Sequence, residues 1–118
     1  MRYNSVLDLH THTVASGHAY CSLREMAKAA SEKGLEVLGI TEHAPSMPGT
    51  CHKFYFNNLK VVPREMYGIQ LLLGSEVNIL DAQGTVDLEE KTLSNMDVVI
   101  ASLHTPCLSL IHISEPTR

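Results

Sequence analysis

The chain has 118 residues, of which 44% are hydrophobic, and it carries a formal net charge of −4. This length allows one domain with a modest core, and the acidic balance without clustered Lys or Arg argues against a protein whose main task is to coat nucleic acid. No stretch approaches the roughly 20 apolar residues of a membrane span, and no secretory leader is visible. The three cysteines are odd in number and widely spaced, which favours reduced thiols. We therefore expect a soluble, cytoplasmic protein without a membrane partner.

The first part of the chain predicts a strand, a helix and a second strand. Residues 6–9 form a short strand. Ser22 and Glu25 match the reciprocal capping box that begins a helix, apolar residues follow at helical spacing, and Gly34 ends it. Residues 35–41 are apolar and bounded by turn residues, as in a parallel strand that is buried on both faces.

The middle of the chain is less regular. Residues 44–51 contain two prolines and a glycine and are expected to form a loop. Residues 54–66 are ambiguous, and we expect a strand fragment followed by a short helix around Pro63. Residues 69–80 form the clearest strand of the chain.

The last part of the chain again predicts a regular alternation of strands and helices. Residues 81–84 suggest a hairpin turn, residues 88–95 a helix and residues 98–103 a further strand. Strands that alternate with helices predict a parallel α/β sheet, in which right-handed crossovers place all the carboxyl ends of the strands along one rim. Folds of this kind build their sites at that rim.

Side chains that can bind a metal stand at the ends of the predicted strands. His10 and His12 are two residues apart, so a strand directs both imidazoles to the same face, where they can hold one divalent ion. Two histidines at this spacing also occur by chance, and the rest of the pattern decides between the two interpretations. His43, Glu76 and His104 end the next three strands, and His18 lies in the loop after the first.

This pattern predicts a cluster of metal ions. Glu76 suits a bridging role between two ions, because a carboxylate has two oxygens and an imidazole has one free lone pair. His10 and His12 would share the first ion with Glu76, His104 would belong to the second, and His18 with His43 could supply a third. Such ions serve phosphoester hydrolysis, since one makes a water molecule nucleophilic and the others neutralise phosphate oxygens. No side-chain nucleophile is required, and no catalytic side chain is assigned.

Three further residues each allow two interpretations. Asp8 and Glu42 stand next to predicted ligands and could orient an imidazole from behind, or they could be ordinary loop or helix-facing carboxylates. His52 lies in the loop after the second strand, where it could approach a substrate phosphate, although a solvated loop histidine is the simpler interpretation.

Four segments, residues 8–19, 39–44, 74–79 and 101–106, resemble the N-terminal motifs of the PHP (polymerase and histidinol phosphatase) family, most closely its stand-alone phosphatase branch. The resemblance implies an α/β fold, the N-terminal half of a distorted (β/α)7 TIM-like barrel. It also implies a trinuclear centre of zinc, with manganese possible, at the strand ends. The six predicted ligands match the pattern, whereas three further ligands of the family, a His, an Asp and a His, have no counterpart in the chain.

The function that follows is a metal-dependent phosphoesterase that hydrolyses a small phosphorylated metabolite through metal-activated water. A non-catalytic PHP module is the alternative from another class, and a polymerase-associated nuclease or proofreading domain is a second enzymatic one. The complete set of six ligands favours catalysis, and the acidic balance counts against a nucleic-acid substrate.

Residues 108–118 resemble no part of the family. Read back into codons, they spell the transposase adapter that is used to prepare sequencing libraries, so we expect a truncated PHP domain over residues 1–107 and a non-native tail over residues 108–118. His112 is then excluded as a ligand. A natural C-terminus is the alternative. With ligands missing, the 118-residue fragment itself is expected to be inactive.

Overall fold

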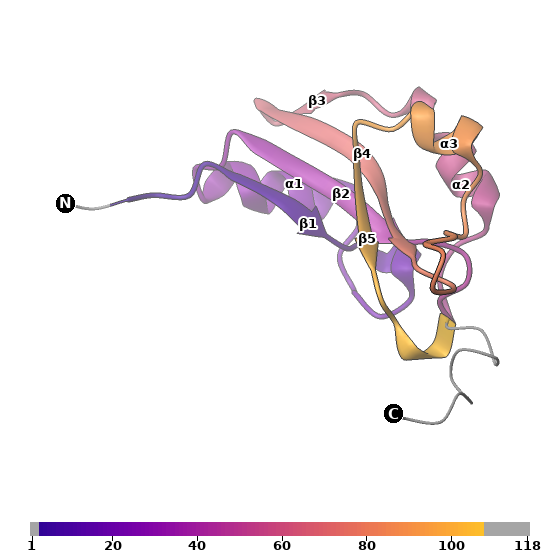
Figure 1. Cartoon of the computed structure of the whole chain (residues 1–118). Coiled ribbons are helices and arrows are strands. Elements are labelled where there is room, and N and C mark those ends of the chain that lie inside the picture. The colour runs from indigo at the N-terminus through magenta and orange to yellow at the C-terminus, as the bar shows by residue number, and fades with distance from the viewer. Residues whose placement is uncertain (1–2, 108–118) are drawn as a thin grey trace.

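The protein is described by a computed structural model that covers residues 3–107. Its centre is a curled sheet of parallel strands in the order β1-β2-β4-β5 (Figure 1). The four strands are β1 (Leu7–Thr11), β2 (Val37–His43), β4 (Ile69–Asn78) and β5 (Val98–Ser102). The expected α/β fold, the N-terminal part of a TIM-like barrel, is confirmed, and the predicted strands are correct to within a few residues at each end.

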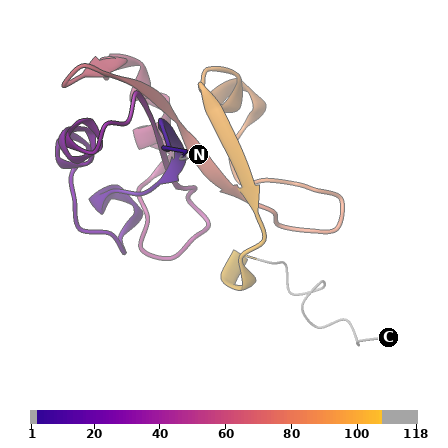
Figure 2. The ribbon, with the colours of Figure 1, turned by 90° about the vertical axis from the view of Figure 1, so that its left-hand side faces the viewer.

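Helix α1 (Leu23–Glu32) links β1 to β2 and packs beside the sheet, where Figure 2 shows it close to end-on. The predicted capping box begins it. The Ser22 hydroxyl accepts a hydrogen bond from the Glu25 amide at 3.2 Å, and the Glu25 carboxylate accepts one from the Ser22 amide at 2.8 Å. Ala27 and Ala30 are buried against the sheet, and Gly34, with a φ of 85°, follows the end of the helix.

The segment between β2 and β4 differs from the prediction. Helix α2 (Lys53–Asn57) begins just before residues 54–66, and the 3₁₀ turn η2 (Leu59–Val61) and then strand β3 (Glu65–Met66) follow it, so the expected order of strand before helix is wrong. Burial of Phe56 and Leu59 decides the helical part. Pro63 cannot donate a backbone hydrogen bond and lies between the two elements, after which β3 pairs antiparallel with the start of β4.

The remaining connections are short. Residues 44–51 form a loop as predicted, and the hairpin turn after β4 is marked by a bridge between Ile79 and Val86. Helix α3 (Glu90–Ser94) is shorter than the predicted 88–95. The turns η1 (Val14–Ser16) and η3 (Thr105–Cys107) follow β1 and β5. Among residues 3–107 no helix is long and apolar enough to cross a membrane.

The buried residues change character along the strands. Leu38, Ile40, Leu71 and Leu73 form the centre of an apolar core. Towards the carboxyl ends of β2 and β4 the buried side chains become polar, and they are Thr41, Glu42, His43, Ser75, Glu76 and Asn78. Buried polar groups destabilise a fold unless they are paired or bind a ligand. Their concentration at this rim indicates a candidate functional site. The predicted tail, residues 108–118 with His112, lies outside the described residues.

Candidate metal centre

Four parallel strands deliver the six predicted ligands to one rim of the sheet. His10 lies in β1 and His12 directly follows it, His43 ends β2, Glu76 lies near the end of β4, and His104 follows β5 by two residues. His18 approaches from the loop after η1, and its ring centre is 4.7 Å from that of His43 and 5.5 Å from that of His12. The structure therefore brings all six together.

Strand β1 has an irregularity where His10 projects from it. The pairing with β2 shifts register between Asp8 and Thr11, which places one extra residue in β1. Bulges of this kind re-aim side chains and are common beside active sites. The Asp8 carboxylate accepts a hydrogen bond from the His10 backbone amide at 3.1 Å at this position. Asp8 therefore supports the backbone of a ligand and does not contact its imidazole.

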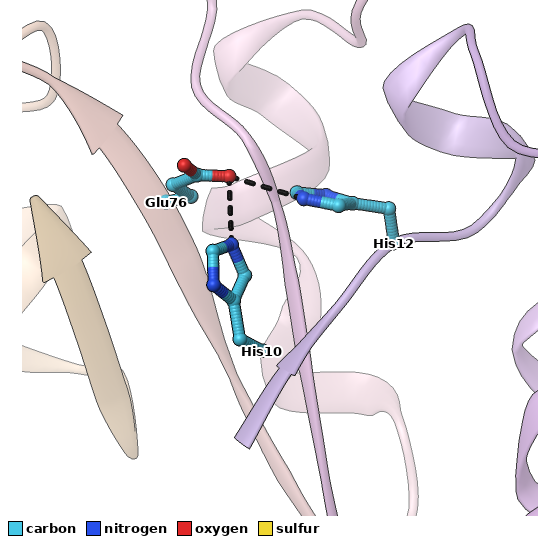
Figure 3. Close-up of side chains that lie close together, drawn as sticks. All are labelled: His10, His12 and Glu76. Carbon is cyan, nitrogen blue, oxygen red and sulfur yellow. Dashed lines mark hydrogen bonds and ion pairs between the residues drawn. The ribbon is translucent and has the colours of Figure 1, made fainter. Parts of the chain in front are cut away.

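Glu76 is the centre of the cluster. Its Oε1 lies 3.0 Å from Nε2 of both His10 and His12 (Figure 3) and 3.4 Å from Nδ1 of His43. Its Oε2 lies 3.3 Å from Nε2 of His104. The two oxygens thus face different histidines, as a bridging carboxylate requires. Among residues 3–107, two triplets have ligand atoms within 4.8 Å of one another, His10 with His12 and Glu76, and His43 with Glu76 and His104.

The charges within the cluster suit cation binding. Burial alone would raise the pKa of Glu76, but hydrogen bonds from Ser102 and His10 and the nearby imidazoles outweigh burial and lower this pKa to about 2. Burial lowers the pKa of His43 to about 4 and also lowers that of His12. At neutral pH Glu76 is therefore a charged carboxylate and His12 and His43 are neutral imidazoles, which are the protonation states that metal ions bind.

Glu42 lies behind the cluster and is fully buried. Its carboxylate accepts hydrogen bonds from the Thr13 amide at 2.9 Å, the Thr13 hydroxyl, the Ser16 hydroxyl at 2.7 Å and the Tyr55 hydroxyl at 3.3 Å. Burial raises the pKa of Tyr55, which keeps it a donor. Among the described residues, the hydrogen bonds of Glu42 lead to an imidazole only through Ser16.

Ser16 connects Glu42 to two of the ligands. Its hydroxyl has one proton, which it donates to Glu42, so it must accept from its other partners. These are the His43 backbone amide at 2.9 Å and Nδ1 of His12 at 3.2 Å. This hydrogen-bond pattern assigns the proton of neutral His12 to Nδ1. The unprotonated Nε2 then faces the Glu76 carboxylate, and two acceptors 3.0 Å apart repel each other unless a metal ion or a further proton pairs with them.

His43 provides an independent test of whether a metal fits. Its Nδ1 is buried and has no hydrogen-bond partner among the described residues, although it lies beside Glu76. A buried nitrogen without a partner destabilises a protein, and coordination would use its lone pair. Imidazoles combined with a carboxylate suit zinc or manganese better than calcium. The residues present therefore fit the ions that the sequence predicts.

A family model described as PHP domain matches residues 8–116 of the chain. The chain belongs to the PHP domain family. This confirms the resemblance drawn from the four motifs. The match includes all six predicted ligands, and it extends through residues 108–116, which the sequence analysis expected to belong to a non-native tail.

Curated relatives of this PHP domain are bacterial proteins named as probable phosphatases. One from Clostridium novyi is 56% identical over 117 residues, which cover 99% of this chain and 47% of the relative. One from Caldanaerobacter subterraneus is 50% identical over 107 residues, which cover 91% of this chain and 42% of the relative. One from Clostridium botulinum is 52% identical over 118 residues. The chain spans about half the length of the curated relatives it matches.

His52 has a structural role in this PHP domain. Its Nδ1 accepts a hydrogen bond from the Phe54 amide at 3.1 Å and so caps the N-terminus of α2. The side chain is exposed, and a contact with substrate stays a prediction.

Three supporting residues of the PHP site were missed by the sequence analysis. They are Ser16, Asn78 and Asp87. The Asn78 Oδ1 lies 2.6 Å from Nδ1 of His104, and the Asn78 Nδ2 donates to Asp87. Asn78 lies two residues after Glu76 on the same strand, so alternation along β4 could have indicated it. Ser16 and Asp87 lie outside the strands, and no periodicity marks them.

Proposed function

We propose that the protein containing these residues hydrolyses a small phosphorylated metabolite and binds two or three zinc ions, or manganese in their place. The observation that carries the proposal is the Glu76 carboxylate, whose two oxygens face imidazoles from three other strand ends. The names of the relatives, probable phosphatases, support the same reaction class.

Each predicted ligand would bind a particular ion of the cluster. When bound, divalent ions lower the pKa of water and neutralise charge on phosphate oxygens. His10 and His12 would hold one ion with Glu76, and Glu76 would share a second with His104. His43 and His18 lie next to each other and would supply the third, with His43 close enough to Glu76 to contribute there.

Glu42 would act as a positioning residue for His12. Its carboxylate takes the Ser16 proton, and Ser16 in turn accepts from His12 Nδ1. This arrangement directs Nε2 of His12 towards Glu76, as hydrogen-bonded partners behind metal-binding histidines commonly do.

The substrate and location follow from charge and chemistry. A net charge of −4 without a basic cluster disfavours nucleic acid and leaves ions as the main attraction for a phosphate. Three free cysteines fit a reducing compartment such as the cytoplasm. The complete set of six ligands disfavours a non-catalytic module.

Elemental analysis and turnover of the full-length gene product test the proposal. We expect two or three zinc or manganese ions per chain, and metal-dependent hydrolysis of p-nitrophenyl phosphate that a chelator abolishes. Less than one tightly bound ion per chain would contradict it. Bound ions without hydrolysis of any phosphate ester would favour the non-catalytic alternative.

A matched pair of histidine variants makes the test specific. His10→Ala should lose metal, whereas His52→Ala, outside the cluster, should retain it. A raised KM for His52→Ala at unchanged metal content would assign His52 to the substrate, and an unchanged KM would leave it only its capping role.

A further inference from the structure

His104 has a second polar contact on the side of its ring that faces away from Glu76. Its Nδ1 lies 2.6 Å from Oδ1 of Asn78, which is fully buried in β4. The assignment of oxygen and nitrogen in the Asn78 amide is fixed by its other partners. Its Nδ2 donates to the Asp87 carboxylate at 2.7 Å and to the Ala44 carbonyl at 3.3 Å, and both partners can only accept.

Asp87 holds this amide from the hairpin that follows β4. One carboxylate oxygen accepts from the Asn78 backbone amide at 2.9 Å, and the other accepts from Asn78 Nδ2 and from the Ser46 amide at 2.8 Å. Ser46 lies in the loop after β2. Asp87 thus links the hairpin after β4 to the loop after β2. Its hydrogen bonds also allow the Asn78 amide only one orientation.

The Asn78 oxygen determines which nitrogen of His104 carries the proton. If Nε2 of neutral His104 carried it, an unprotonated Nδ1 would face the Asn78 oxygen, and two acceptors would lie 2.6 Å apart. With the proton on Nδ1, this contact is a short hydrogen bond. Nε2 is then a free lone pair that faces Oε2 of Glu76 at 3.3 Å.

We propose that Asp87 and Asn78 are positioning residues that hold His104 as its Nδ1–H tautomer and so present Nε2 to a metal ion shared with Glu76. In water the neutral histidine side chain favours the Nε2–H tautomer, so Asp87 and Asn78 would reverse the ordinary preference. The role in metal binding rests on the proposed function, whereas the tautomer does not.

The tautomer is measured by ¹⁵N NMR on the metal-free, full-length gene product with labelled histidine, at about pH 8, above the ordinary imidazole pKa. The His104 signals are assigned with His104→Gln. We expect Nδ1–H in the wild type and Nε2–H in Asn78→Ala. An Nε2–H tautomer in the wild type overturns the proposal. Because the wild type decides, the test stands even if Asn78→Ala does not fold.

Zinc titration tests the metal-binding role with a matched pair of aspartates. In Asp87→Asn an amide replaces the carboxylate, so an NH₂ group must face at least one of the three donors. Asp81→Asn is the control, because Asp81 also accepts from two backbone amides of the same hairpin but does not contact Asn78. We expect Asp87→Asn to weaken one zinc site by about 10–100-fold and to leave the others unchanged.

Equal zinc affinities in the two variants would overturn the metal-binding role of Asp87. If the wild type binds no zinc, the proposed function fails, and the NMR result still decides the tautomer. The two failures are therefore distinguishable.

Discussion

Glu76 provides the negative charge around which four of the predicted histidine ligands are arranged. Glu76→Gln keeps the shape of the side chain but removes this charge and turns one oxygen into a donor, so zinc occupancy should fall by two ions per chain. Elemental analysis of the full-length protein measures it. Glu89→Gln is the control, because Glu89 is exposed and, within residues 3–107, forms an ion pair only with Lys53 at 3.7 Å. Loss of a single ion would show that Glu76 does not bridge.

His43 should make the metal-free protein sensitive to mild acid. Its pKa is lowered from 6.5 to about 4 by burial, so the unfolded chain binds more protons than the folded one between these values. The free energy of unfolding should therefore fall as the pH drops from about 6.5 to about 4. The corresponding loss for Glu76, with a pKa lowered from 4.5 to about 2, comes at lower pH.

Urea denaturation across this pH range measures the effect. His43→Leu should flatten the dependence, whereas His52→Leu, an exposed position, should leave it unchanged. A wild-type slope that persists in His43→Leu would assign the sensitivity to other groups.

The sequence predicts the metal ligands more reliably than the residues that hydrogen-bond to them or orient them. His10, His43 and Glu76 are found because each lies at or near the carboxyl end of a strand, and parallel strands end at one rim. Ser16 and Asp87 could not be predicted, because their partners depend on the path of loops. Ser16 and Glu42 are 26 residues apart in sequence, and only the fold brings them together.

At the scale of the elements, the approach of β5 to β4 depends on Gly74. A Cβ at this position would lie 1.6 Å from the Val98 carbonyl oxygen. Gly74→Ala should therefore push β5 away and displace His104, at a cost of about 1–3 kcal/mol or more. Thermal unfolding and zinc content measure the two effects.

Gly68→Ala is the control for this change. It meets no atom within 4 Å but requires an unfavourable φ of 79°. It should cost about 1–2 kcal/mol and keep its zinc. Full zinc content in Gly74→Ala would mean that the spacing of the strands does not set the position of His104.

Long elements are also predicted more reliably than short ones. Helix α1 is predictable because its capping box, its apolar spacing and Gly34 all agree. In residues 54–66 no such signals agree, and tertiary burial of Phe56 and Leu59 decides the structure. Short helices lack enough internal hydrogen bonds to be specified locally.

At the scale of the whole molecule, the sheet has open edges. Within residues 3–107, β1 pairs only with β2 and β5 pairs only with β4. Leu7 is 50%, Val99 42% and Leu103 62% exposed. Unpaired edges that carry apolar side chains favour pairing with other chains.

The 118-residue chain, expressed alone, should therefore self-associate and show no hydrolysis of p-nitrophenyl phosphate above background. Size-exclusion chromatography with light scattering measures the association. Val99→Lys should reduce it, because a charge on an edge strand opposes pairing, whereas Val61→Lys, also exposed but outside the sheet, should not. A monodisperse, cooperatively melting monomer with metal-dependent hydrolysis would show that these residues close their own edges in solution and complete the site without further ligands.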